Sequence, residues 1–132
     1  MINKINLPYP INSLEPYYNQ ETLLIHYNIL YAGYVENTNK TEEKLIQARK
    51  NNNFENIKCL EKDLSFYGSG AILYQLFFEN IGPATYSAPS TELMQEISKD
   101  FESYDKFKNQ FTEAAKTVEA SRMVYIVLGS KV

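Results

Sequence analysis

His26 is the residue with the widest chemical range in this sequence, and it is the one histidine among 132 residues. The stretch around it has apolar or aromatic residues at the spacing of one helix face: Leu23, Tyr27, Leu30 and Tyr34. A histidine on such a face either hydrogen-bonds within the core or binds a transition metal through a neutral imidazole. Because a metal site needs three or four donors and no second histidine exists, the residue types alone favour the core role.

Two other features could carry chemistry: Cys59, and the glycine pair Gly68 and Gly70. The sequence around each of them favours a packing role instead. Cys59 has no histidine nearby in the sequence that could activate it as a nucleophile. The two glycines lack a lysine or an acidic partner at the spacing of a phosphate-binding loop. We therefore expect Cys59 to pack as an ordinary side chain, and the glycine pair to mark a close approach of two helices.

The composition is that of a folded domain and excludes several kinds of partner. Hydrophobic residues make up 44% and charged residues 22% of the chain, which are globular values. A net charge of -3 argues against nucleic acid and against an anionic membrane surface. The N-terminus has no apolar signal-peptide region, and the longest uncharged run, residues 64–78, is too short to span a bilayer. We expect cytoplasmic synthesis and no nucleic-acid or membrane partner.

The hydrophobic pattern predicts helices in two lobes. A proline-containing arm at residues 6–20 precedes the first lobe. The helices predicted there cover about 21–36, 41–50, 54–66 and 71–81. A Ser/Pro/Thr linker over residues 84–91 places the lobe boundary between 1–83 and 84–132. In the second lobe, one helix begins at Ser90 or Thr91 and another at Ser103 or Asp105.

The last apolar stretch predicts a single buried strand that forms an interface. Its β-branched and aromatic residues are Met123, Val124, Tyr125, Ile126, Val127 and Leu128. No second strand is predicted, and the backbone groups of a strand must find partners. We therefore expect this strand to pair with the same strand of a second copy. The alternative is that the segment continues the preceding helix and packs on the helical lobe.

Four motifs occur in a familiar order along the chain. Leu-Pro-Tyr at 7–9 with Leu-Glu-Pro-Tyr at 14–17 is followed by the His26 helix, the glycine-rich run 66–78, and Asp-Phe-x-Ser-Tyr-x-Lys-Phe-Lys-x-x-Phe at 100–111. Together they resemble the iron/manganese superoxide dismutase family along almost the whole chain. The resemblance implies a mainly α fold. It consists of an N-terminal helical hairpin of that family's type and a truncated α/β lobe with a single C-terminal strand.

The sequence departs from the family at the metal ligands. The family binds one iron or manganese ion with two histidines from the helical lobe and an aspartate and a histidine from the later sheet. The resemblance places the first of these positions on His26, the second on Tyr74, and the gateway tyrosine on Tyr34. The Asp-x-Trp-Glu-His pattern of the later ligands does not occur in this sequence. We therefore expect no bound metal, and a hydrogen-bonded cluster of His26, Tyr34 and Tyr74 in its place.

Our leading functional hypothesis is a catalytically inactive dismutase-like protein with no cofactor and a structural or self-assembly role. It would form a homo-oligomer through residues 123–128, and a spore layer is one assembly compatible with it. The first alternative is half of a split iron or manganese superoxide dismutase, with a partner chain supplying the other ligands. The second is a small-molecule binding module in which Tyr31, Tyr34 and Tyr74 surround His26.

Overall fold

The computed structural model describes residues 1–85, 88–119 and 123–126. Contacts divide the chain into two units, Met1–Thr85 and Tyr86–Val132. Our boundary between residues 83 and 84 stays a prediction. Within the described residues, no helix has both the length and the apolar character needed to cross a membrane.

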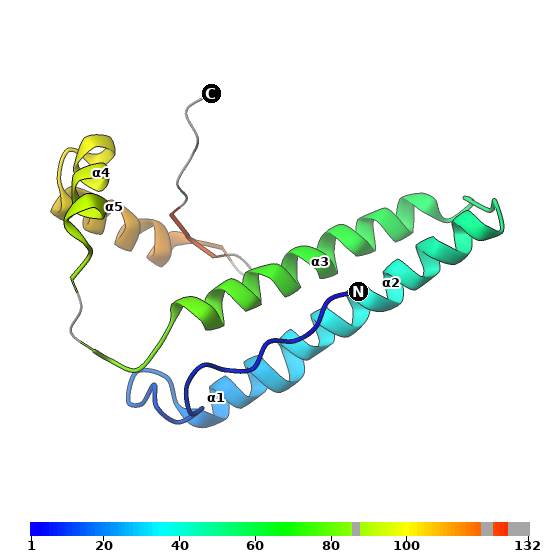
Figure 1. Cartoon of the computed structure of the whole chain (residues 1–132), viewed down its shortest axis with the longest axis horizontal. Coiled ribbons are helices and arrows are strands. Elements are labelled where there is room, and N and C mark those ends of the chain that lie inside the picture. The colour runs from blue at the N-terminus through cyan, green and yellow to red at the C-terminus, as the bar shows by residue number, and fades with distance from the viewer. Residues whose placement is uncertain (86–87, 120–122, 127–132) are drawn as a thin grey trace. The chain divides into compact units, whose positions relative to one another are not determined.

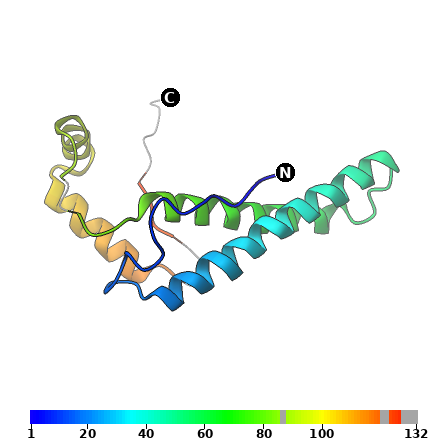
Figure 2. The same ribbon diagram turned by 60° about the horizontal axis from the view of Figure 1, so that its bottom comes forward.

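The first unit is a helical hairpin (Figure 1). Its first arm is continuous and passes from α1 (Gln20–Ile25) through the π-helix η1 (His26–Tyr31) into α2 (Ala32–Lys50). Its second arm is α3 (Ile57–Asn80), which runs antiparallel beside α2 in both ribbon views (Figures 1 and 2). The helical hairpin predicted from the family resemblance is confirmed.

Both arms are longer and less interrupted than the sequence pattern predicts. The break expected at residues 37–40 is absent because polar side chains there bond to carbonyls one turn earlier in α2. Thr38 Oγ1 donates to the Tyr34 carbonyl at 2.7 Å, and Thr41 Oγ1 donates to the Asn37 carbonyl at 2.8 Å. Thr38 and Thr41 are buried, so their hydroxyls are satisfied inside the helix. The glycine pair likewise lies within the continuous helix α3.

The π-helix shifts the buried face of the first arm by one residue. The predicted face continued through Leu30 and Tyr34, but Leu30 is 40% exposed whereas Tyr31 is 1% exposed. A π-helix has i→i+5 hydrogen bonds, so it places an extra residue in the turn compared with an α-helix. The buried positions are therefore Tyr31, the last residue of η1, and Val35 in α2.

The N-terminal arm is fastened along the hairpin. The backbone of Ile2 exchanges two hydrogen bonds with the side-chain amide of Asn39, at 2.8 and 2.9 Å. The Tyr27 hydroxyl donates to the Ile5 carbonyl at 2.6 Å, and the Tyr31 hydroxyl accepts from the Ile5 N–H at 3.3 Å. These contacts cover the core of the hairpin, whose buried members are Leu14, Leu23, Tyr31, Val35, Ala71 and Phe78.

The second unit contains α4 (Thr91–Phe101) and α5 (Tyr104–Thr117). Ser90 and Ser103 cap their N-termini, since each hydroxyl accepts from a backbone N–H three residues later. Both caps are among the positions predicted from the sequence. Phe101 and Phe107 join the two helices, with ring centroids 5.1 Å apart.

The predicted C-terminal strand is not found, and this prediction is wrong for Met123–Ile126, which carry no strand. Val127 and Leu128 lie outside the described residues. The described parts of the chain contain no other strand with which residues 123–126 could pair. Tyr125 and Ile126 instead border a hollow on α4 together with Ile97 and Phe101. Apolar side chains of the segment therefore lie beside the apolar face of a helix.

Candidate functional site

His26 and Tyr74 meet between the two arms of the hairpin. Nδ1 of His26, the first residue of η1, lies 3.1 Å from the hydroxyl oxygen of Tyr74 in α3. This is a hydrogen bond, and the imidazole tautomer decides which of the two groups donates. Both side chains are half-buried. The one histidine of the chain is therefore paired with a phenol oxygen.

The ring of Tyr74 is held by three other aromatic rings. Tyr31 and Phe78 stack on it with centroids 6.0 Å away in each case, and Tyr34 lies at 5.7 Å. Tyr31 and Phe78 are almost completely buried. Stacked rings of this kind restrict the orientation of Tyr74, so its hydroxyl stays directed at His26.

The surroundings of Tyr74 favour its neutral form. Burial raises the pKa of its hydroxyl above the ordinary value, and the neighbouring phenol of Tyr34 adds to the rise. At neutral pH the hydroxyl therefore keeps its proton unless a positive charge comes close to it.

Tyr34 reaches this cluster because α3 has a glycine opposite it. A Cβ atom on Gly70 would lie only 2.4 Å from Cδ1 of Tyr34, far inside contact distance. The predicted close approach of the two arms at the glycine pair is thus confirmed at Gly70. At Gly68 the nearest atom to such a Cβ, Cγ2 of Thr38, is 4.0 Å away.

The structure places Tyr74 next to both His26 and Tyr34. Two further residues of the cluster, Tyr31 and Phe78, were not singled out by the hydrophobic pattern of the sequence. Phe78 lies one turn after Tyr74 on the same face of α3, and that spacing could have identified it. The burial of Tyr31 could not be found in this way because the π-helix changes the spacing. The role of the cluster as a functional site is a proposal.

Of the side chains between the two arms, His26 can supply one ligand of an iron site, because imidazole nitrogen is a common iron ligand. The Tyr74 hydroxyl keeps its proton and is hydrogen-bonded to His26 at 3.1 Å, so it is a poor metal donor as it stands. The described residues contain no group of three or more His, Cys, Asp or Glu side chains that could hold a metal ion. Further ligands would come from outside the described residues.

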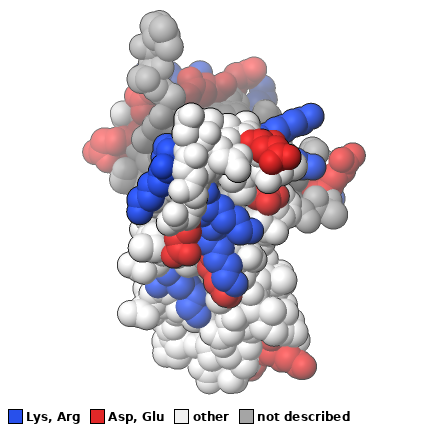
Figure 3. Space-filling view, turned by 90° about the vertical axis from the view of Figure 1, so that its right-hand side faces the viewer, with Lys and Arg blue, Asp and Glu red and all other residues white. Residues whose placement is uncertain are grey.

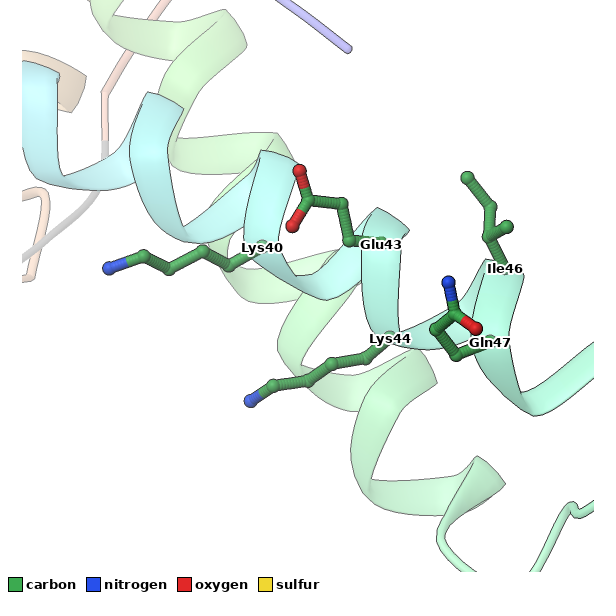
Figure 4. Close-up of a pocket in the computed structure, with 5 residues that line it drawn as sticks. All are labelled: Lys40, Glu43, Lys44, Ile46 and Gln47. Atoms are coloured by element: carbon green, nitrogen blue, oxygen red, sulfur yellow. The ribbon is translucent and has the colours of Figure 1, made fainter.

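A separate hollow lies on α2, and its residues do not form a comparable cluster. Figure 4 shows its lining, which comes from one helix: Lys40, Glu43, Lys44, Ile46 and Gln47. Lys40 is ion-paired with Glu36 at 2.6 Å. On the face shown in Figure 3, basic and acidic side chains are interspersed among the described residues. This face therefore has the mixed charge of an ordinary solvated surface.

Comparison with known proteins identifies the family. Residues 3–82 match the alpha-hairpin domain of iron/manganese superoxide dismutases, and residues 89–131 match the C-terminal domain of the same enzymes. The chain belongs to the iron/manganese superoxide dismutase family. The resemblance found from the sequence motifs is confirmed.

Three relatives are named as the iron form of superoxide dismutase. The protein of Methanothermobacter marburgensis is 40% identical over 117 residues, which are 87% of this chain and 58% of the relative. That of Methanothermobacter thermautotrophicus is 38% identical over 117 residues, 87% of this chain and 57% of the relative. The protein of Pyrobaculum aerophilum is 38% identical over 115 residues, which are 86% of this chain and 54% of the relative. This chain spans about half the length of these relatives.

These relatives correct our hypothesis of an inactive protein and our expectation of no cofactor. Proteins named as iron superoxide dismutases match most of this chain at 38–40% identity, so the predictions of no enzymatic activity and no metal are wrong. The reasoning failed because it counted ligands within this sequence alone. The relatives extend well beyond the part that this chain matches, and ligands can lie there.

Proposed function

We propose that this chain functions as part of an iron-dependent superoxide dismutase in which His26 is one iron ligand. The observation that carries the proposal is the position of His26. The one histidine of the chain lies between the arms of a hairpin that matches the dismutase alpha-hairpin domain. The names of the relatives support iron as the metal.

The remaining ligands come from protein outside the described residues. They belong either to a further part of the same polypeptide or to a second polypeptide, as in the split-enzyme alternative. The similarity to about half the length of each relative supports this arrangement. We do not propose a small-molecule pocket, because Tyr31, Tyr34 and Tyr74 pack their rings against one another.

Superoxide dismutation moves one electron between two superoxide ions and adds two protons to the ion that is reduced, giving dioxygen and hydrogen peroxide. A bound iron ion supplies the one-electron redox couple. In this chain, His26 would hold the metal from the first arm of the hairpin. Tyr34 and Tyr74 would keep hydroxyl protons close to His26, and the buried Tyr31 and Phe78 would exclude water from one side of the site.

We also propose self-association. The described part of the C-terminal segment exposes apolar surface at Tyr125 and Ile126, which are 63% and 48% exposed. Two copies could associate through the apolar side chains of residues 123–128 without forming a β-strand, and this contact remains a proposal. Synthesis in the cytoplasm also remains a proposal. A spore layer has no support from the relatives, and we do not propose it.

The experiment is to purify the tagged protein from its native cells, with any polypeptide that stays bound, and to measure superoxide consumption. The variants are His26→Ala and, as a matched control on the exposed side of the same arm, Gln47→Ala. The parent and the control should consume superoxide, and His26→Ala should fall to background. A parent preparation at background, or a His26→Ala variant as active as the parent, would contradict the proposal.

A further inference from the structure

We propose that the outer face of α3 is a contact surface for the α3 helix of a second copy of this chain, packed antiparallel to the first. The face holds neither His26 nor any of residues 123–128, so the contact is separate from both surfaces proposed above. It needs no metal and goes beyond the proposed function.

Six exposed residues of α3 follow one another at alternating spacings of three and four. They form one row along the helix, here called the α3 stripe: Lys62, Ser65, Ser69, Ile72, Leu76 and Glu79. This alternation is the seven-residue repeat of helices that pack side by side in coiled coils. At 3.6 residues per turn, the stripe lies on the side of α3 opposite Ala71 and Phe78, which are buried in the hairpin core. The stripe therefore faces away from the hairpin's own core.

The middle of the α3 stripe has the character of an interface rather than of a solvated helix face. Residues 64–78 contain no charged side chain. Ile72 and Leu76 are 59% and 45% exposed. The hydroxyl of Ser69 donates to the Phe66 carbonyl at 3.1 Å, so that group would stay hydrogen-bonded if the face were covered. Covering such a face removes apolar surface from water without leaving this hydroxyl unpaired.

The sizes of the side chains fit a second copy that runs antiparallel. When a two-fold axis passes between residues 70 and 71 of both helices, Ile72 lies opposite Ser69 of the second copy. Leu76 then lies opposite Ser65 of the second copy. Large residues that face small ones let two helices interdigitate without voids. Each of these pairs occurs twice, because the contact uses the same surface on both copies.

The charges at the two ends of the α3 stripe select the same arrangement. In the antiparallel pair, Lys62 lies opposite Glu79 of the second copy at both ends. A parallel pair would place lysine against lysine and glutamate against glutamate, which repel each other. Glu79 accepts a hydrogen bond from Gln75 at 3.0 Å, and a carboxylate has room for further donors. The α3 stripe is thus complementary to itself in both size and charge.

Zero-length cross-linking of the full chain tests the contact directly. A water-soluble carbodiimide joins a lysine amine to a carboxylate that touches it. Lys62 and Glu79 lie about 25 Å apart along one α3 helix, so a link between them joins two copies. In a mixture of unlabelled and nitrogen-15-labelled chains, mass spectrometry should find this linked peptide with one half of each kind. Its absence would overturn the proposal, as would a link of either residue to a different polypeptide in its place.

Charge reversal adds a quantitative test with an internal control. Lys62→Glu and Glu79→Lys should each weaken the α3 contact about tenfold at low ionic strength, because each places like charges together twice. The double variant should restore association, since it brings opposite charges together again. The two residues do not touch within one chain, so this recovery can come only from a contact between copies. Sedimentation equilibrium measures the association, and a double variant no better than the single ones would contradict the proposal.

A substitution in the middle of the α3 stripe should abolish the contact. Ile72→Glu should weaken it at least about a hundredfold, because two carboxylates would be buried in an apolar interface. Ile46→Glu, at another exposed isoleucine of the hairpin, is the matched control and should keep the mass of the parent. Where residues 123–128 also join copies, loss of the α3 contact should halve the mass rather than reduce it to one chain. Circular dichroism checks that both variants fold, and an Ile72→Glu variant with the mass of the parent would overturn the proposal.

Discussion

The ring of Tyr34 occupies the place that a side chain at Gly70 would need. A Cβ atom on Gly70 would lie 2.4 Å from Cδ1 and 2.5 Å from Cε1 of Tyr34. Carbon atoms in contact are normally about 3.5–4.0 Å apart, so either the ring or the helix would have to move. The position of Tyr34 beside Tyr74 therefore depends on a residue without a side chain on the opposite arm.

Gly70→Ala should destabilise the hairpin and displace Tyr34. We expect the free energy of unfolding to fall by about 1–3 kcal/mol, the usual effect of overpacking a well-packed site. Gly33→Ala is the matched control, because a Cβ atom there meets nothing within 4 Å and the residue lies in α2. That variant should gain about 0.5–1 kcal/mol from the better helix propensity of alanine. Equal effects of the two substitutions in urea unfolding would contradict this account of Gly70.

Tyr9 should make the fold sensitive to alkaline pH. Its hydroxyl donates to the Phe78 carbonyl, and burial raises the pKa of that hydroxyl above the ordinary value. The folded protein then holds this proton more tightly than the unfolded chain. The stabilisation is fully present below the unfolded pKa of about 10 and is lost as pH rises through the folded pKa.

Tyr9→Phe should reduce the loss of unfolding free energy above about pH 10, as measured by urea titrations at a series of pH values. The exposed Tyr17→Phe controls for the removal of one tyrosine from the denatured chain. If the unfolding free energy of Tyr9→Phe falls with pH as steeply as that of the parent, the proton on Tyr9 does not contribute to stability.

The sequence predicted the local features of the fold better than the long-range ones. Helix caps at Ser90 and Ser103 follow from side-chain chemistry within a few residues, and they are correct. The break predicted from the polar run at residues 37–40 was wrong because Thr38, and Thr41 just after the run, are buried where α2 packs against the other arm. Propensity cannot anticipate that burial.

The candidate site could be predicted in part. The resemblance brought His26, Tyr34 and Tyr74 together, because ligand positions in a family share one place in space. The sequence analysis did not predict the π-helix, because no local residue preference indicates an extra residue in a helical turn. It therefore did not predict that Tyr31 is buried. The strand at residues 123–126 was wrong because strand propensity reflects the partners that a segment finds, and its apolar residues lie beside α4.

Tyr27 should fasten the N-terminal arm to the hairpin. Its hydroxyl donates to the Ile5 carbonyl at 2.6 Å, and the amino group of Lys4 lies 3.6 Å from the centre of its ring. Tyr27→Phe removes the hydrogen bond and keeps the ring, so stability should fall by about 1 kcal/mol. Backbone amides of residues 2–7 should also exchange faster with solvent. Tyr17→Phe, at a residue that is 78% exposed, should change neither measurement. Unchanged exchange in Tyr27→Phe would show that the arm is held by other contacts.

Removal of residues 123–132 should reduce self-association. The exposed apolar side chains of Tyr125 and Ile126 belong to this segment, and their loss should shift the mass measured by light scattering toward a single chain. Circular dichroism should still show the helices of the hairpin, whose core lies in the first unit. A folded truncated protein that keeps the mass of the parent assembly would exclude the segment as the interface.

Metal analysis of the native protein tests the central claim most directly. The tagged chain, isolated from its own cells with any bound polypeptide, should contain iron in a fixed ratio to the chain by inductively coupled plasma mass spectrometry. The His26→Ala protein, prepared in the same way, should have lost that iron. A native preparation without stoichiometric iron, or iron that stays bound at full occupancy after His26→Ala, would contradict the assignment of this chain to an iron-dependent superoxide dismutase.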